Sequence, residues 1–415
     1  MLNLFSLSKR KGSNVKKKLL FIGITMNCAG TERSFLSLVN NIDKEKYDID
    51  LLLAKREGKF LDLLPKEVNV IEMPECGEMF TLTGKNAPGA IFKCFVKKNP
   101  LLIFKILPYA LKMVLNRKKR SIIAMRLWCS FLKYMPEFDA SEYDSVISYW
   151  GDKTMFYMVD RVKAKNKITW LHFDYSYPER DDELYGKYFS ACDKVVTVSH
   201  TLCESLAEKF PDISDKCTVI ENIVDPKLIR DLALRGDEFP DGHFSGTRIL
   251  SVGRMTHQKG FDKIAPVLAG LRSDGYNVRW YIVGDGEERD SLINSAMAAG
   301  VPDVFLFLGS TDNPYSYMRD CDLFVLPSRY EGKPITVEEA KILYKPIIVT
   351  NYLSAEEQLD DGKLGMICGM EPEDIYRAVK TLLDDNERKD AYSRALADKK
   401  LGNTEEIQKF YKILE

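Results

Sequence analysis

The chain has 415 residues, with 60 lysine and arginine residues against 61 aspartate and glutamate residues, and a net charge of −1. This length corresponds to about three typical domains, so we expect two or three domains. With 45% hydrophobic and 29% charged residues, the composition excludes a disordered or low-complexity chain. The balanced charge also argues against general binding of polyanions, and we expect no nucleic-acid partner.

No segment predicts a membrane span or a metal centre. Residues 1–18 carry charges where a signal peptide would need an apolar core, and two lysines and a proline interrupt the apolar stretch 101–115. The histidines number only 4, and neither HExxH nor a Cys/His cluster is present. We therefore expect a cytoplasmic protein that needs no metal or other cofactor.

Short apolar runs alternate with amphipathic helical stretches in the first half of the chain. The predicted strands are 17–24, 47–54, 69–73, 144–149, 167–172 and 193–199, and the predicted helices include 31–42 and 200–210. This alternation is typical of βαβ units, which form a parallel sheet covered by helices on both faces.

The polar, turn-rich stretch 235–246 is the best candidate for a linker, because a second series of strands and helices follows it directly. The predicted strands are 247–253, 278–284, 304–309, 323–328 and 346–350, and the predicted helices include 260–271, 287–300, 373–385 and 404–415. The sequence therefore predicts an α/β protein with two doubly wound, Rossmann-like domains facing across a cleft, 1–242 and 243–400. Ligands of such folds bind at the carboxyl ends of the strands, so motifs there carry most weight.

Residues 79–136 form a basic amphipathic segment within the first domain. The segment contains no acidic residue, and apolar and aromatic residues alternate with its lysines and arginines. Such a segment suits an anionic membrane surface, where each basic residue near the lipid contributes roughly 1 kcal/mol. The alternative is a pair of helices that packs on the core and exposes a solvated basic face. We favour docking on the inner face of the cell membrane.

Two motifs lie at predicted strand ends in the second domain. In ILSVGRMTHQKGF, Gly253 ends a strand, and Arg254 and Lys259 flank the loop that opens the next helix. Both cations suit a diphosphate, although two solvated surface cations are the alternative interpretation. In LPSRYEGKPITVEEA, Glu331 lies in the loop and Glu339 lies about two helical turns further on. A carboxylate in the cleft can bind the hydroxyls of a ribose or a sugar, and a helix start favours phosphate.

These motifs resemble the donor-domain signatures of glycosyltransferase family 4, most specifically over residues 245–385. Glu331 and Glu339 match the EX7E pattern of that family, and residues 28–39 resemble its glycine-rich first loop and helix, with Ala29 where the family has a glycine. The resemblance implies the GT-B fold and a retaining transferase. It also implies that the last helix, within 401–415, returns to the first domain.

The same resemblance implies roles for individual residues. Arg254 and Lys259 would bind the donor diphosphate, Glu339 the ribose and Glu331 the donor sugar. The remaining donor-binding positions would be Gly30, Gly253, Gly284, Gly309, Gly332, Ile335 and Thr336.

His172 closes a predicted strand of the first domain, and in the family a histidine at a comparable strand end reaches the donor sugar. The resemblance therefore adds His172 to Glu331, Arg254 and Lys259 as a catalytic residue. The alternative is a histidine with a purely structural hydrogen bond at the end of a strand, which is the common case.

The function predicted from these motifs is the transfer of a sugar from a nucleotide-sugar, most simply a UDP-sugar, to a hydroxyl of a saccharide acceptor. The basic segment favours a lipid-linked acceptor, as in the synthesis of capsular or other cell-surface polysaccharide. Two alternatives remain open. One is a GT-B epimerase of nucleotide-sugars, and the other is a catalytically silent glycosyltransferase-like subunit that supports a partner at the membrane.

Overall fold

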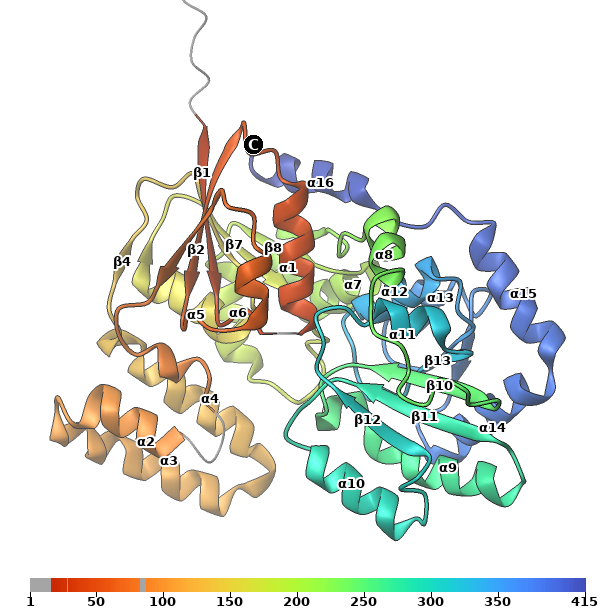
Figure 1. The fold of residues 1–415 in the computed structure, drawn as a ribbon. Helices are drawn as coiled ribbons and strands as arrows, with labels where there is room; N and C mark the ends of the chain where they lie inside the picture. Colours follow the sequence, from red (N-terminus) through yellow and green to blue (C-terminus); the bar gives the residue numbers. More distant parts are fainter. Residues whose placement is uncertain (1–15, 28, 83–86) are drawn as a thin grey trace, which may run out of the picture.

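The computed structural model describes residues 16–27, 29–82 and 87–415. Its two large sheets occupy separate parts of the molecule, one in the upper left and one in the lower right of Figure 1. Every neighbouring pair of strands in both sheets is parallel. This arrangement confirms the predicted α/β class with two parallel sheets.

The first sheet has 7 strands in the order β3-β2-β1-β5-β7-β8-β9. Its strands are β1 (Lys17–Gly23), β2 (Tyr47–Leu53), β3 (Val68–Glu72), β5 (Ser145–Ser148), β7 (Lys167–Leu171), β8 (Lys194–Thr197) and β9 (Cys217–Val219). The helices that connect them are α1 (Gly30–Asn41), α5 (Asp152–Arg161), α6 (Asp182–Ser190) and α7 (His200–Lys209). A separate two-stranded ladder pairs β4 (Phe138–Asp139) with β6 (Val162–Lys163).

The second sheet has 6 strands in the order β12-β11-β10-β13-β14-β15. Its strands are β10 (Thr247–Val252), β11 (Val278–Val283), β12 (Phe305–Gly309), β13 (Leu323–Leu326), β14 (Ile347–Thr350) and β15 (Met366–Cys368). The helices of this half are α8 (Pro226–Ala233), α9 (Ile264–Ser273), α10 (Arg289–Ala298), α11 (Tyr315–Asp320), α12 (Ile335–Ile342), α13 (Ala355–Leu359), α14 (Pro372–Asp384) and α15 (Asn386–Ala397).

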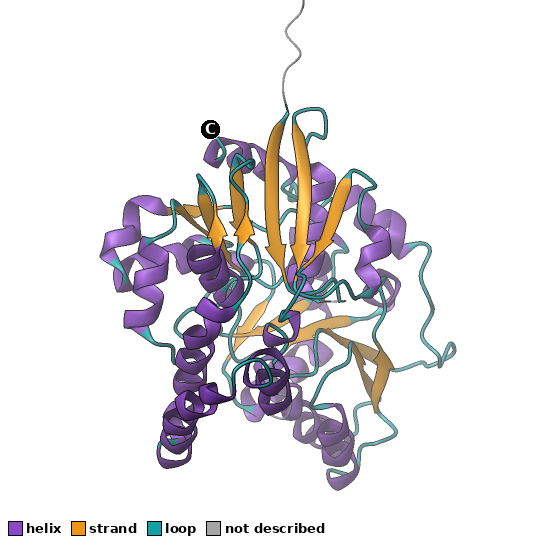
Figure 2. Ribbon diagram, turned by 90° about the vertical axis from the view of Figure 1, so that its left-hand side faces the viewer, coloured by secondary structure: helices purple, strands orange, loops and turns teal. Residues whose placement is uncertain are grey.

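Each sheet is buried on both faces, which explains why its strands are nearly continuous apolar runs. Along β1, Leu20 and Ile22 belong to one hydrophobic cluster, whereas Leu19 and Phe21 belong to another on the opposite face. Side chains alternate across a strand, so a strand between two helix layers needs apolar residues at every position. The strands of the first sheet point toward the second sheet in Figure 2, which brings the carboxyl ends of both sheets together.

Two predicted elements differ from those of the structure. The helix predicted over 260–271 begins only at Ile264, because Gly260 has a φ of 66° and a short 3-10 turn follows it. The stretch 235–246 is anchored to the second sheet: Phe239 is buried, and Asp241 forms ion pairs with Arg248 at 3.4 Å and with Arg279. The polar, turn-rich composition of residues 235–246 predicted a linker and gave no sign of these contacts with the second sheet.

The last helix, α16 (Ile407–Ile413), lies beside the first sheet although it follows the second sheet in sequence (Figure 1). Phe410 stacks on Phe21 of β1 with ring centroids 6.2 Å apart, and Tyr411 stacks on Tyr47 with centroids 5.3 Å apart. The end of the chain therefore connects the two halves of the molecule.

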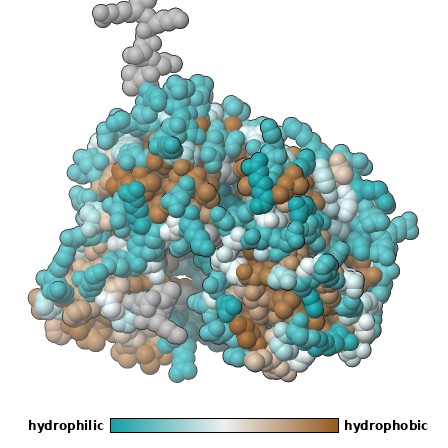
Figure 3. All heavy atoms as spheres, in the orientation of Figure 1, coloured by the Kyte–Doolittle hydropathy of each residue, from teal (hydrophilic) through white to brown (hydrophobic). Residues whose placement is uncertain are grey.

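The described part of the basic segment folds into α2 (Ala87–Ile91), a π-helical turn (Phe92–Val96), α3 (Ile103–Leu115) and α4 (Arg120–Phe131). Helix α4 buries Leu127, Trp128 and Phe131, whereas α3 buries none of its residues. Figure 3 shows hydrophobic residues on the outer surface of this lower left part of the molecule. Within the described ranges, no helix combines the length and the apolar character needed to cross a membrane.

Candidate active site

A cavity of about 490 Å³ lies where the carboxyl ends of the two sheets meet. One wall consists of the start of α1, Trp150 after β5, and His172 and Phe173 after β7. The opposite wall consists of the loops after β10, β11, β12 and β13 and the start of α12. This is the place where parallel sheets bind ligands, because loops from several strands converge there.

Most of the predicted site residues lie together in this cavity. Its lining includes Gly30, His172, Gly253, Arg254, Lys259, Gly284, Glu331, Ile335, Thr336 and Glu339. Gly309 and Gly332 are absent from the lining, although their neighbours Ser310 and Glu331 belong to it. The assigned roles of all these residues remain predictions.

Gly332 lies at a contact between the two halves of the molecule instead of on the cavity surface. A Cβ atom at this position would be 2.4 Å from the backbone oxygen of His172. A separation this short is impossible for a carbon atom, so only glycine lets the loop after β13 approach the end of β7. The lack of a side chain thus gives Gly332 a packing role, and its predicted donor contact stays a prediction.

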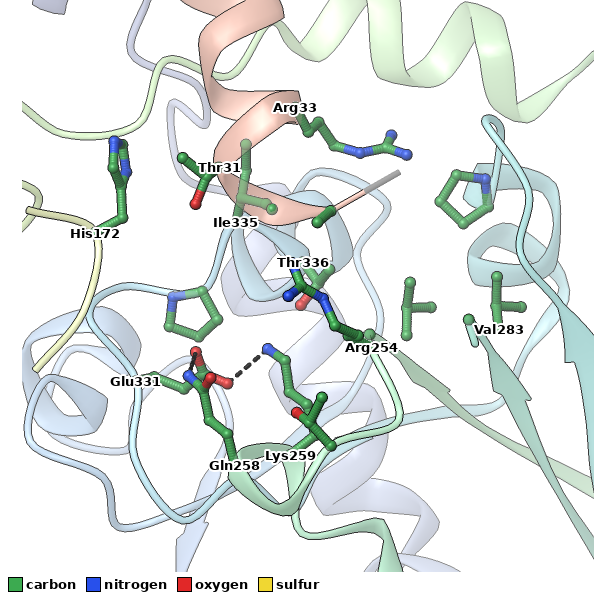
Figure 4. Close-up of a pocket in the computed structure, with 18 of the residues that line it drawn as sticks. Thr31, Arg33, His172, Arg254, Gln258, Lys259, Val283, Glu331, Ile335 and Thr336 are labelled. Carbon is green, nitrogen blue, oxygen red and sulfur yellow. Dashed lines mark hydrogen bonds and ion pairs between the residues drawn. The ribbon is translucent and has the colours of Figure 1, made fainter. Parts of the chain in front are cut away.

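Lys259 and Glu331 bind each other in the structure. Lys259 Nζ is 2.6 Å from Glu331 Oε1, and Ser328 Oγ donates to the same carboxylate oxygen at 2.6 Å. Gln258 Nε2 donates to the other oxygen at 3.3 Å (Figure 4). From the sequence, the two charged residues were predicted to bind different parts of the donor, and their pairing was not predicted. This ion pair holds the Lys259 ammonium group at the cavity wall, and its positive charge balances the negative charge of the buried Glu331 carboxylate.

The start of α12 faces the cavity beside Arg254 (Figure 4). The first amides of a helix have no partner inside the helix and carry partial positive charge. Thr336 Oγ1, in the first turn, is buried and has no hydrogen-bond partner among the described residues. Two cations, a helix start and a hydroxyl therefore converge on one region, which suits an anionic group such as a diphosphate.

The structure places Glu339 on the cavity and Glu338 away from it. Glu339 is 1% exposed, its Oε1 accepts a hydrogen bond from Tyr315 Oη at 2.8 Å, and its Oε2 is buried without a hydrogen-bond partner in the described structure. Burial raises the pKa of Glu339. Glu338 instead forms an ion pair with Lys341 at 2.8 Å and accepts a hydrogen bond from Gln358 at 2.9 Å.

His172 lies on the opposite wall, with its ring 6.1 Å from that of Trp170 and nearly parallel to it. Desolvation by the surrounding residues lowers the pKa of His172 to about 3, so the imidazole is neutral at physiological pH. Its Nε2 is buried and has no hydrogen-bond partner among the described residues. A neutral histidine of this kind can exchange a hydrogen bond with a ligand but cannot supply a positive charge.

Sequence reasoning missed several residues that reach the cavity from the other half of the molecule. Arg33 of α1 donates to Tyr315 Oη at 2.6 Å, and Asn222 donates to the backbone oxygen of Lys333 at 3.1 Å. Asn222 also belongs to the cavity lining, although no motif in the sequence marked it. The position of Arg33, three residues after Gly30 in the first loop, was the available signal for its proximity to the site.

Comparison with known proteins places this fold and site in a known class. Residues 244–398 match the protein family described as Glycosyl transferases group 1. An uncharacterized glycosyltransferase of Haemophilus influenzae is 27% identical over 379 residues, which cover 89% of this chain and 90% of that protein. The N-acetylgalactosamine-N,N'-diacetylbacillosaminyl-diphospho-undecaprenol 4-alpha-N-acetylgalactosaminyltransferase of Campylobacter jejuni is 27% identical over 216 residues, covering 50% of this chain and 56% of that enzyme.

Among solved structures, Anabaena HepE in complex with UDP-glucose superposes with a TM-score of 0.67 at 17% identity, covering 96% of this chain and 99% of that chain. The fold and the site together define a GT-B glycosyltransferase that uses a nucleotide-sugar donor. Over residues 244–398, the chain matches the retaining enzymes of glycosyl transferases group 1, also called family 4. The predicted family, fold and enzyme class are confirmed.

Proposed function

We propose that this protein transfers a sugar from a UDP-sugar to a hydroxyl of a lipid-linked saccharide during the synthesis of a capsular or other cell-surface polysaccharide. The observation that carries the proposal is the convergence of Arg254, Lys259 and the start of α12 on one wall of the cavity. Beside them lies Glu339 Oε2, which no residue in the described part of the chain binds. A nucleoside diphosphate has an anionic diphosphate, which suits the two cations and the helix start, and ribose hydroxyls, which suit the carboxylate.

In this proposal, the diphosphate binds to Arg254, Lys259 and the first amides of α12, near Ile335 and Thr336. Negative charge develops on the diphosphate as the sugar leaves, and preorganised positive groups stabilise the transition state more than the ground state. Two side-chain cations and a helix start supply this stabilisation without a divalent metal ion. The leaving phosphate oxygen accepts the acceptor proton, because none of the cavity residues described above is placed as a general base.

The donor sugar lies between the two walls, within reach of His172 on one side and Glu331 on the other. The neutral His172 shares a hydrogen bond with a sugar hydroxyl through Nε2. Glu331 is held by Lys259, Ser328 and Gln258, so that its orientation is set before the donor arrives. Such preorganisation lowers the entropic cost of placing the sugar for transfer.

The experiment that tests this function is donor hydrolysis and donor binding across UDP-, GDP- and ADP-sugars in the presence of EDTA. Turnover of a UDP-sugar is expected, and Arg254→Ala serves as the negative control because it removes a proposed diphosphate ligand. Turnover of a GDP- or ADP-sugar instead would refute the choice of nucleotide. Binding of no donor would favour the silent-subunit alternative, and turnover only after addition of a divalent metal would refute the metal-free chemistry.

The lipid-linked acceptor and the membrane are supported by α3 and by the name of the Campylobacter jejuni relative, which specifies a diphospho-undecaprenol saccharide. Helix α3 exposes a continuous apolar face, on which Phe104, Leu107, Leu111 and Val114 are 68%, 55%, 61% and 62% exposed. Large apolar side chains rarely form such a row on a monomeric soluble protein unless the surface binds something.

Basic residues surround this apolar face. Lys112 lies on α3 itself, and Arg117, Lys118, Lys119 and Arg120 follow at its end. An apolar face with a basic rim matches the interface of an anionic bilayer, where acyl chains lie beneath phosphate headgroups. We therefore propose that α3 lies on the inner face of the cell membrane and brings the cleft close to its lipid-linked acceptor.

Replacing Phe104 and Leu107 together by serine is expected to reduce binding to anionic liposomes by at least about tenfold, because two large apolar side chains no longer enter the bilayer. Co-sedimentation with vesicles containing phosphatidylglycerol measures the effect. Neutralising Lys118, Lys119 and Arg120 should weaken binding mainly at low salt.

The matched control is Leu234→Ser, which removes an apolar side chain that is 73% exposed at the end of α8 in the other half of the molecule. This variant should bind liposomes like the wild type. Equal binding by the Phe104/Leu107 variant and the wild type would contradict docking through α3, whatever the result with the basic residues.

A further inference from the structure

Arg33 of α1 crosses from the first half of the molecule to the nucleotide wall of the cavity. Its Nη1 donates to Tyr315 Oη of α11 at 2.6 Å and lies 3.7 Å from Glu339 Oε1 of α12. Its Nη2 donates to the backbone oxygen of Asp312, in the loop after β12, at 3.2 Å. Figure 4 shows Arg33 extending from α1 over the cavity. One side chain thus contacts three elements of the other half.

The hydrogen bonds of Arg33, Tyr315 and Glu339 have a defined direction. A guanidinium group only donates, so the phenol oxygen of Tyr315 must accept from Arg33. The phenol proton is then available for Glu339 Oε1, which accepts it at 2.8 Å. The result is a relay from α1 through α11 to α12 that occupies one oxygen of the carboxylate.

The other oxygen of Glu339 has no hydrogen-bond partner within the described ranges. Oε2 is buried, no described residue forms a hydrogen bond with it, and Glu339 belongs to the cavity lining. A buried acceptor without a donor is costly, so a ligand that brings a hydroxyl group to it gains binding energy. The geometry thus separates a protein-facing oxygen from a ligand-facing oxygen.

We propose that Arg33 is a positioning residue for the ribose of the donor. Acting through Tyr315, it fixes Oε1 of Glu339 and leaves Oε2 to accept a ribose hydroxyl. Its positive charge also favours the ionised carboxylate, which is the form that accepts two hydrogen bonds. This inference rests on the proposed function, because it assumes that a nucleoside diphosphate occupies the cavity.

The relay also connects ribose recognition to the arrangement of the two halves. Arg33 belongs to the first sheet unit, whereas Tyr315, Asp312 and Glu339 belong to the second. The ribose subsite is therefore complete only when α1 lies against α11 and α12. Binding of the nucleotide and closure of the cleft stabilise each other, since each requires the same contacts.

The test compares the dissociation constants of UDP, 2′-deoxy-UDP and 3′-deoxy-UDP by calorimetry. The wild type should prefer UDP over at least one deoxy analogue by about tenfold or more, the usual effect of a hydrogen bond to a charged group. In Arg33→Gln and in Tyr315→Phe, this preference should fall to about threefold or less, because the carboxylate is no longer oriented. The variant with both substitutions should show the same reduced preference for UDP as each single variant, since all three interrupt one relay.

The matched control is Glu221→Gln, which weakens another contact between the halves, the ion pair of Glu221 with Lys333 at 2.8 Å. It should lower the affinities for UDP and for the analogues by the same factor and keep the preference intact. Thermal unfolding verifies that each variant folds. If Arg33→Gln does not fold, Tyr315→Phe alone provides the test.

If Arg33→Gln and Tyr315→Phe both prefer UDP over the deoxy analogues as strongly as the wild type does, the inference is overturned and Arg33 is only a structural contact. Equal binding of UDP and both analogues by the wild type would also overturn it, while leaving the proposed function intact. The two kinds of failure are therefore distinguishable. If the wild type binds UDP and its deoxy analogues equally well, only this inference fails. If the wild type binds no UDP at all, the proposed function fails.

Discussion

Lys259→Ala is expected to lower donor turnover by about 10²–10³-fold, the usual effect of removing one group that stabilises charge in a transition state. The Lys259 ammonium group lies in the cavity beside the proposed diphosphate position, and it binds the Glu331 carboxylate at 2.6 Å. Because the effect is on the chemical step, it should appear mainly in kcat, which steady-state kinetics with the preferred donor measures.

The same substitution should also destabilise the fold. Removing Lys259 leaves Glu331, which is 5% exposed, with only neutral hydrogen-bond donors. Breaking a buried ion pair from one side costs roughly 3–5 kcal/mol, less where other donors remain. Adding Glu331→Gln to Lys259→Ala should therefore restore stability in denaturant unfolding but leave turnover low. A double variant that regains turnover would contradict the role of Lys259 at the diphosphate.

Glu339→Ala is expected to weaken donor binding by about 10²-fold or more, because the ribose hydroxyls lose a charged acceptor in a buried site. The comparison is with Glu338→Ala, one position away on the same helix. Glu338 is ion-paired with Lys341, so its loss should lower the free energy of unfolding while donor affinity in the folded protein stays near that of the wild type. Titration with UDP and urea unfolding separate the two effects.

The same carboxylate predicts a pH dependence. Burial raises the pKa of Glu339, partly opposed by Arg33 and by the hydrogen bond from Tyr315. As the pH falls, Glu339 therefore takes up a proton earlier than an exposed glutamate, and donor affinity should decline over that range. Glu339→Gln should remove this decline, and equal donor affinity of the Glu338 and Glu339 variants would refute the assignment of the ribose ligand.

Much of the candidate site could be predicted from the sequence because its residues follow strands. Arg254 and Lys259 come after β10, and Glu331 comes after β13. Parallel strands end at the same edge of a sheet, so local motifs at those ends are brought together by the fold itself. The distinction between Glu338 and Glu339 follows from helix geometry, since neighbouring residues point about 100° apart.

The sequence could not predict which apolar faces of the basic segment pack on the core and which face outward. The composition of this segment predicted amphipathic helices but allowed two arrangements: docking on a membrane, which we favoured, or packing on the core with a solvated basic face. In the structure, α4 buries Leu127, Trp128 and Phe131. Helix α3 packs one side against the core and exposes a row of apolar residues that includes Phe104 and Leu111. Periodicity shows that a helix has an apolar face but does not show what covers it.

By itself, the sequence determined the α/β class, the two series of strands and helices, and the strand-end motifs that match a group 1 glycosyltransferase. Only the tertiary structure decided the pairing of Lys259 with Glu331, the packing of Gly332 against β7, and the relay from Arg33 through Tyr315 to Glu339. Arg33 and Tyr315 are 282 positions apart in the chain. Local sequence patterns report local conformation, whereas such partners meet only because the carboxyl ends of the two sheets face each other across a cleft.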